Sequence, residues 1–340
     1  MNRLRYVLLV FVLMLAGTLL GGGAYLGSRM IMDGRGGGKE EQKRRQADEE
    51  TEFLLSDEES RLIEEQMEAA AELILPPAGD QKDIFNLLLI GLDRRDDSWE
   101  GNSDTMILIS VNKPEKSVKM ISFMRDLYAD IPGAGVRKLN AATALGGPSL
   151  LLETLRANYK VEIDNYLSVD FLALIDIVDR IGGVDLTISE EEKEAVNHYI
   201  ADSGNFGVSA YEEHVLDEAG SLHLDGIQAL AYARNRSDQE SDYGRTKRQR
   251  KLLSAICQKC RTLSAAELAS LFFAVLPDVN HDIGTGRLAS LAASLPELLE
   301  YDLSESRIPY DGLYLVKNEI LIPDMAATIE RLHRELYGIE

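Results

Sequence analysis

Two sets of acidic, arginine and amide side chains, far apart in the sequence, are the part of this chain best suited to chemistry. The first set contains Asp93, Arg95, Asp104, Arg125 and Asp126, and the second contains Arg234, Arg236, Asp242, Arg245 and Gln249. Carboxylate oxygens suit a hard divalent cation, and guanidinium groups bind phosphate oxygens through paired hydrogen bonds. These residue types favour a site that binds a pyrophosphate, and we interpret them as a phosphotransferase site.

The overall charge argues against general nucleic-acid binding. The chain has 36 basic and 57 acidic residues, a net charge of −21, and would repel a phosphate backbone. Residues 234–251 are a local exception, with seven basic and three acidic residues. We therefore expect a polyanionic ligand to bind at this segment.

The only two cysteines, Cys257 and Cys260, are spaced C-x-x-C within a predicted helix. A zinc site would need more ligands, and a redox motif normally opens a helix after a strand. We interpret them as buried or incidental thiols, with a local disulfide as the alternative.

The N-terminal segment predicts a membrane anchor. The 23 residues from Tyr6 to Ser28 carry no charge, and a helix of that length extends roughly 34 Å. A cleaved signal peptide is the alternative, because Gly22-Gly23-Ala24 offers small residues, but the apolar run is longer than a normal signal core. Basic residues flank both ends of the run, so their number leaves the orientation open.

Residues 33–52 are rich in glycine and then in charge, which predicts a solvated linker. Ser56-Asp57-Glu58-Glu59 has the form of a capping box and predicts a helix of about five turns that ends at Pro76-Pro77. Its apolar positions at helical spacing are Ile63, Met67, Ala70 and Ile74. The helix is a stalk, a helix packed on the domain, or a short coiled coil.

Three short apolar runs predict buried strands at residues 84–92, 105–111 and 118–123, with a turn at 112–116 between the last two. In an antiparallel meander, the first strand ends where the second begins and where the third ends. The acids and arginines of the first set would then meet at one rim of the sheet.

The rest of the chain alternates between predicted helices and strands. Helices are expected at 149–159, 171–181, 225–233, 243–256, 264–275, 286–299 and from about Met325, and strands at 163–168, 184–189 and 319–322. Residues 190–222 are interpreted as a surface excursion after a first charged helix. The pattern predicts an α/β fold with a mixed central sheet covered by helices on both sides.

In the helix at 243–256, Arg245 and Gln249 lie at i and i+4, and an apolar stripe continues along the same face. Arg234 and Arg236 would face one side if their segment is extended. Purely structural roles are the alternatives to ligand binding. Arg245 would then pair with Asp242 or another acid, and the acids of the first set would act as turn or cap residues.

Six segments in this order resemble the LytR-CpsA-Psr family, over about residues 84–256. They are Leu88 to Arg95, Ser103 to Met106, Ser122 to Asp126, Lys138 to Asn140, Tyr232 to Arg236, and Asp242 to Gln249. The resemblance implies an enzyme that transfers a glycopolymer, such as a teichoic acid or a capsular polysaccharide, from undecaprenyl-pyrophosphate to peptidoglycan. It also implies a hydrophobic pocket for the polyprenyl tail.

The resemblance also implies a location and roles for residues. Residues 1–28 would be the cytoplasmic tail and the anchor in the cell membrane, 29–81 the linker and stalk helix, and 82–340 the extracellular catalytic domain. Asp93 and Asp104 would bind Mg²⁺ or Mn²⁺. The pyrophosphate would be surrounded by Arg95, Arg125, Arg234, Arg236, Arg245 and Gln249. Asp126 and Asp242 are the alternatives for the carboxylate that takes the hydroxyl proton.

Two positions depart from the family pattern, which usually has arginine at position 102 and proline at position 124. This chain has Asn102 and Met124. A missing guanidinium removes a charge-assisted phosphate contact of about 1.5–3 kcal/mol. Asn102 therefore leaves two alternatives to a transferase. One is a protein that binds polyprenyl phosphates or regulates envelope assembly without transfer, and the other is a hydrolase of the lipid pyrophosphate.

Overall fold

The computed structural model describes residues 56–75, 83–93, 101–169, 171–203, 211–235, 241–260, 262–263, 274, 279–288, 301–317 and 320–338. These residues belong to two compact units. The sheet unit comprises the described residues of Gly22–Ser168 and Leu303–Glu340, and the arginine unit those of Val169–Asp302. Each unit is described separately below.

An antiparallel meander forms the centre of the sheet unit. It consists of β1 (Ile84–Asp93), β2 (Asn102–Asn112) and β3 (Ser117–Phe123). Ile84 pairs with Asn112 and Asp93 with Asn102, while Ile107 pairs with Ser122. The predicted meander is therefore confirmed, although β1 and β2 extend into the polar residues that the sequence assigned to the rim.

Within the sheet unit, two further strands extend the meander, in the order β10-β3-β2-β1-β6. β6 (Asn165–Val169) overlaps the strand predicted at 163–168. β10 (Asp302–Ile308) was not predicted, because five of its seven residues are charged or serine and give no apolar run. The fold is mixed α/β, with a central mixed sheet flanked by helices.

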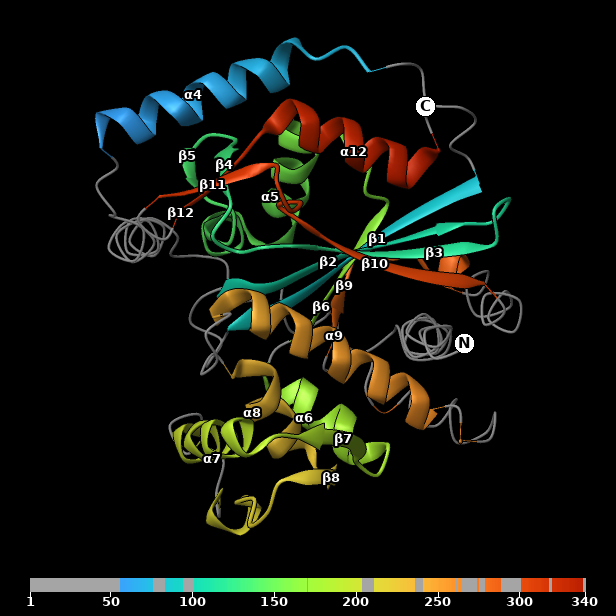
Figure 1. The fold of residues 1–340 in the computed structure, drawn as a ribbon. Coiled ribbons are helices and arrows are strands. Elements are labelled where there is room, and N and C mark those ends of the chain that lie inside the picture. Colours follow the sequence, from blue (N-terminus) through green and yellow to red (C-terminus); the bar gives the residue numbers. More distant parts are fainter. Residues whose placement is uncertain are drawn as a thin grey trace, which may run out of the picture. The chain divides into compact units, whose positions relative to one another are not determined.

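Helices α4 (Asp57–Glu72), α5 (Ala141–Tyr159) and α12 (Met325–Tyr337) belong to the sheet unit. Figure 1 shows α4 lying alongside α12, and α4 also contacts α5. The backbone of α5 is interrupted at Gly146 and Gly147, and Gly147 has a φ of 69°. The interruption explains why the sequence predicted only the later part of this helix.

Helix α4 packs on the folded unit. Its predicted capping box is present, with the Ser56 amide donating to Glu59 Oε2 at 2.8 Å. Ile63 is 1% exposed and lies in a core cluster with Tyr128 and Ile322. The prediction that the helix continues toward Pro76 was wrong: it ends at Glu72, and Ile74, beyond its end, is 92% exposed. Proline disfavours helical backbone at the residue that precedes it, so the helix must end before Pro76.

Two short hairpins complete the sheet unit. One is formed by β4 (Tyr128–Ile131) and β5 (Gly135–Lys138), and the other by β11 (Tyr314–Lys317) and β12 (Ile320–Pro323). A single bridge between Leu127 and Leu321 joins the two hairpins. Only β12 corresponds to a predicted strand, because it contains the apolar run Ile320-Leu321-Ile322, and the other four-residue strands give too little periodicity to detect.

The arginine unit contains α6 (Phe171–Arg180), β7 (Val184–Ile188), α7 (Glu190–Ser203), β8 (Gly220–Leu224), α8 (Gly226–Arg234) and α9 (Ser241–Cys260). A short 3₁₀ helix, η4, spans Tyr211–His214, and β9 spans Asn280–His281. The interpretation of 190–222 as a surface excursion was wrong. Val196 and Ile200 of α7 are fully buried, and β8 pairs antiparallel with β7.

Several expectations fall on parts of the chain that the structure does not describe. They are the anchor at Tyr6–Ser28, the linker at 33–52, and most of the helices expected at 264–275 and 286–299. Among the helices that are described, none combines the length and the apolar character that a bilayer crossing requires. The anchor and the division into regions at residues 28 and 81 stay predictions.

Candidate functional site

The rim of the meander brings part of the first residue set together. Arg125 Nη1 donates to Asp104 Oδ1 at 2.8 Å, and Arg125 Nε lies 3.4 Å from Asp126 Oδ2. Asp104 lies on β2, whereas Arg125 and Asp126 follow β3. Their side chains are 15–20% exposed, so water screens these charges only partly. The predicted convergence is confirmed for these three residues.

A bulge in β2 sets the position of Asp104. Gly91 pairs with Thr105 and Leu92 with Ser103, so Asp104 has no direct partner on β1. A bulge inserts one extra residue and changes the direction of a side chain at the end of a ladder. Glycine is required opposite it, because a Cβ at Gly91 would lie 2.9 Å from Thr105 Cβ. The Gly91-Leu92-Asp93 segment is therefore fitted to this bulge.

Lys138 is a member of this rim to which the sequence assigned no role. Its Nζ donates to Asp126 Oδ1 at 2.9 Å, and its side chain is 23% exposed. Asp126 thus accepts from one cation on each of its carboxylate oxygens. The sequence signal was present, since Lys138 belongs to the Lys138-Leu139-Asn140 segment, but its partner depends on the unpredicted hairpin of β4 and β5.

Hydrogen bonds of the backbone hold the loop that carries Arg125 and Asp126. The Arg125 carbonyl accepts from the Asn140 amide at 3.3 Å, and the Asp126 carbonyl accepts from the Leu321 amide at 3.3 Å. The hydroxyl of Thr143 donates to that of the fully buried Ser103 at 2.7 Å. The rim is consequently supported by β12, α5 and the start of β2.

Helix α4 reaches the surroundings of this rim. Burial raises the pKa of Tyr128, and the nearby carboxylates of Glu59 and Asp126 raise it further. Glu59 belongs to the first turn of α4 and is 3% exposed. The helix that precedes the sheet in sequence therefore contributes a buried carboxyl group that acts on Tyr128.

Two departures from the family pattern fit their places locally. Asn102 is the first residue of β2 and pairs with Asp93. Met124 is 2% exposed, and its amide donates to the Ile308 carbonyl at 2.9 Å. A proline at position 124 has no amide hydrogen and could not make this bond. Methionine therefore adds a link between the end of β3 and β10.

The second residue set lies in the arginine unit. Arg234 ends α8, and its Cζ lies 5.4 Å from the centre of the Tyr199 ring on α7. Arg245 on α9 is 3% exposed. Leu252 and Ile256, which belong to the predicted apolar stripe of the same helix, are also buried. Lys247 and Lys251 are exposed on the same helix.

Arg248 is a residue of this unit that the sequence argument missed. Its Nε donates to Glu192 Oε1 at 2.9 Å, and its Nη1 donates to the Asn235 carbonyl at 3.1 Å. Its spacing of three residues from Arg245 places it on the same helix face, which was the available signal.

Several predicted site residues fall outside the described part of the chain. Arg95 and Arg236 do so entirely, and the side chains of Asp93 and Asp242 are not described. The remaining members lie in two different compact units. A single pocket that contains both sets, and the roles assigned to each residue, stay predictions.

The donor chemistry at the rim fits a divalent metal ion. Asp93 pairs with Asn102, two residues before Asp104, so two aspartates belong to adjacent ends of β1 and β2. A carboxylate has about four acceptor positions, so the bond from Arg125 leaves coordination by Asp104 feasible. Within the described ranges, no group of three or more His, Cys, Asp or Glu residues gathers as a metal site.

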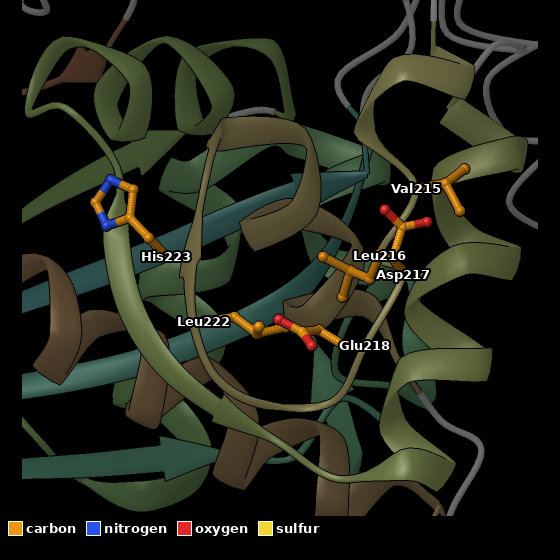
Figure 2. A pocket seen from close by; sticks show the side chains of 6 residues that line it. All are labelled: Val215, Leu216, Asp217, Glu218, Leu222 and His223. Atoms are coloured by element: carbon orange, nitrogen blue, oxygen red, sulfur yellow. The ribbon is translucent and has the colours of Figure 1, made fainter.

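The arginine unit has a pocket of about 410 Å³, and none of its described lining residues is a predicted site residue. Figure 2 shows its lining residues, which include Leu216, Asp217, Glu218 and Leu222. Its His223 ring is held by Asp185 Oδ1 at 2.7 Å and the Gly182 carbonyl at 2.8 Å. None of its described lining residues is arginine or lysine, so they do not suit a pyrophosphate.

Comparison with known proteins decides the family. A model of the LytR_cpsA_psr family matches residues 32–335. The chain belongs to the LytR-CpsA-Psr family. The resemblance inferred from the six sequence segments is thereby confirmed.

Two sequence relatives of this LytR-CpsA-Psr protein illustrate the range of names in the family. One is the polyisoprenyl-teichoic acid–peptidoglycan teichoic acid transferase TagU of Enterococcus faecalis, 33% identical over 69% of the chain and 71% of the relative. The other is Biofilm regulatory protein A of Streptococcus mutans, 33% identical over 66% of the chain and 56% of the relative. The first name describes a transferase and the second a regulator.

A solved structure of the Bacillus subtilis protein YwtF (TagT) has the same fold. Its TM-score is 0.54 at 25% identity, and the match covers 78% of this chain and 95% of that one. That structure contains a bound octaprenyl pyrophosphate lipid. The relative therefore binds the class of ligand that the arginines and aspartates of this sequence predict.

Proposed function

We propose that this protein transfers a glycopolymer from undecaprenyl-pyrophosphate to peptidoglycan and forms a phosphodiester. The observation that carries the proposal is the rim where Asp104, Arg125, Asp126 and Lys138 form one chain of ion pairs. Such alternation of carboxylates and cations suits a metal-bound diphosphate. The transferase names of relatives and the pyrophosphate lipid bound by YwtF support it.

The reaction transfers one phosphoryl group. The oxygen of an acceptor sugar hydroxyl attacks the phosphorus that carries the glycopolymer, and the bond from that phosphorus to the bridging oxygen breaks. Undecaprenyl phosphate leaves, and the hydroxyl proton goes to a carboxylate. The barrier depends chiefly on positioning and on neutralising phosphate charge.

The roles of the residues follow from their contacts. Asp104 orients the Arg125 guanidinium, which would donate to phosphate oxygens, and Asp126 holds the other side of the same group. Arg95, Arg234, Arg236, Arg245 and Gln249 would supply the further donors, as the family pattern implies. A Mg²⁺ or Mn²⁺ ion bound by Asp93 and Asp104 would supply charge neutralisation.

Asp126 and Asp242 remain the two candidates for the proton acceptor. Asp126 already accepts from Arg125 and Lys138, which compete with a substrate hydroxyl for its oxygens. Asp242 lies in the first turn of α9 and near Arg245 in sequence. Replacing each aspartate with asparagine identifies the acceptor. Only the variant that lacks the proton acceptor should lose the rise of activity with pH.

We propose that the protein works at the outer face of the cell membrane. The apolar run Tyr6–Ser28 would anchor it, and residues 82–340 would form the extracellular catalytic domain. Labelling of a cysteine in this domain by a membrane-impermeant thiol reagent in intact cells tests the orientation. Labelling only after cell lysis would contradict it.

A second candidate function is binding of the lipid carrier without transfer. Asn102 favours it, because the family pattern has an arginine there, and Biofilm regulatory protein A carries a regulatory name. The arrangement of the rim favours transfer, since three of its charged groups are already oriented toward one another.

One experiment separates the functions. The full-length protein is incubated in detergent with a lipid-pyrophosphate-linked oligosaccharide, peptidoglycan fragments and Mg²⁺, and the products are analysed by mass spectrometry. A new phosphodiester between the two saccharides supports transfer. Bound but unchanged lipid supports the binding function, and release of the oligosaccharide without a new linkage supports a hydrolase.

A further inference from the structure

The arginine unit contains a buried cation whose contacts point to structural control of the site. The Arg248 side chain is 6% exposed and bonds to two different helical elements. Its Nε donates to Glu192 Oε1 on α7, and its Nη1 donates to the main-chain carbonyl of Asn235. A buried arginine is costly unless its donors are satisfied, so this arrangement fixes its position firmly.

The Asn235 carbonyl lies next to a predicted site residue, Arg234, at the end of α8. Asn235 is the residue between Arg234 and Arg236, and it caps the C-terminal end of α8. It is fully buried, and its amide bonds back to the Tyr232 carbonyl at 3.3 Å. The last carbonyls of a helix carry partial negative charge and lack partners within the helix, so a guanidinium stabilises them.

Helix α7 supports the same point from a second position. Glu192 lies in its first turn, and Tyr199 two turns later lies beneath the Arg234 guanidinium. Burial raises the pKa of the Tyr232 hydroxyl, the charge of Glu192 raises it further, and the charge of Arg248 lowers it. Glu192 and Arg248 are paired at 2.9 Å, and the charges of both act on Tyr232 in the last turn of α8.

We propose that Arg248 is a positioning residue that fixes Asn235 and so holds the adjacent Arg234 in place for a diphosphate. This inference rests on the proposed function for its ligand, whereas the fixing of α8 does not depend on that function. Arginine suits the role better than lysine, because its planar fork reaches an acid on one helix and a carbonyl on another at once.

The test compares Arg248→Met with Lys247→Met in the full-length protein. Lys247 is exposed and precedes Arg248 on the same helix, so both variants lose one positive charge. The probe is inorganic pyrophosphate with Mg²⁺, measured by isothermal titration. We expect Arg248→Met to weaken binding at least about tenfold and Lys247→Met to change it less than about threefold. Equal losses in the two variants would show a general charge effect and overturn the proposal.

Hydrogen exchange of the ligand-free protein supplies a readout that needs no pyrophosphate. Amides in peptides from residues 226–235 should exchange faster in Arg248→Met and at the wild-type rate in Lys247→Met. Peptides from α12 in the sheet unit are the internal reference. Faster exchange in both places would indicate general destabilisation and contradict a positioning role, as would unchanged exchange at 226–235.

The two readouts separate this inference from the proposed function. If the wild type binds no pyrophosphate, the proposed function fails, and the exchange of residues 226–235 still decides whether Arg248 fixes α8. If the wild type binds and the exchange at 226–235 is unchanged in Arg248→Met, only the inference fails. Arg248→Lys should recover part of the affinity, because it retains the charge opposite Glu192 but cannot reach both acceptors.

Discussion

Asp104 and Arg125 are 21 residues apart and form an ion pair in which Nη1 lies 2.8 Å from Oδ1. The pair joins the bulge at the start of β2 to the loop after β3. Both side chains are about one-fifth exposed, so the pair is stronger than an exposed surface ion pair and less costly to form than a fully buried one. It is the contact on which the first predictions depend.

Replacing Asp104 with asparagine should reduce transfer about 100-fold or more. The change preserves shape, removes the charge that orients Arg125, and removes a proposed metal ligand. Product formation under saturating Mg²⁺ measures the effect. Asp130→Asn is a matched control, because Asp130 is exposed on β4, and it should retain nearly full activity. Wild-type activity in Asp104→Asn would refute the role of this carboxylate.

Replacing Lys138 with methionine should lower kcat/KM about tenfold. The change releases Asp126 Oδ1, so Asp126 can move toward Arg125 and compete with phosphate for its guanidinium. Steady-state kinetics with the lipid-linked donor provide the measurement. Arg137→Met is the control, because Arg137 lies next to Lys138 on β5 and its Nε donates to the Ala134 carbonyl. Similar losses in both variants would indicate that net charge, and not Asp126, is responsible.

Helix α4 should stabilise the sheet unit. Truncating Ile63 to alanine removes a fully buried side chain from the contact with Tyr128 and Ile322, at an expected cost of about 2–5 kcal/mol. Ile74→Ala should cost less than about 0.5 kcal/mol, because Ile74 is 92% exposed. Urea unfolding followed by circular dichroism compares them. If both variants are as stable as the wild type, α4 is an independent stalk.

The buried His333 should make stability depend on pH. Burial lowers the pKa of its imidazole, whose Nε2 lies 3.1 Å from the Tyr159 carbonyl oxygen. The unfolded chain therefore binds this proton more readily than the folded one. The stabilisation is present above the unfolded pKa of about 6.5 and is lost as the pH falls through the folded value.

His333→Gln should therefore flatten the pH dependence of the unfolding free energy between about pH 7.5 and 5. One proton accounts for at most about 1.4 kcal/mol per pH unit. Burial also lowers the pKa of His281, so a smaller slope should remain in the variant. Urea midpoints across this range provide the measurement, and identical slopes in variant and wild type would contradict the prediction.

The sequence by itself determined the meander, the capping box of α4 and the family. These depend on local signals: apolar runs of strand length, a Ser-x-x-Glu pattern, and ordered segments of fixed residue types. From the meander alone, the meeting of Asp104, Arg125 and Asp126 could be predicted, because antiparallel strands bring the ends of consecutive strands to one edge.

The tertiary structure decided which additional side chains hold these groups in place. Lys138 reaches Asp126 through a hairpin of two four-residue strands, and Arg248 meets Asn235 and Glu192 through the packing of three helices. Neither contact has a local pattern, since the partners are 12 to 56 residues apart and any arginine on an acidic protein has many potential partners. Packing in the folded chain selects the partners, because an unpaired buried charge would be too costly.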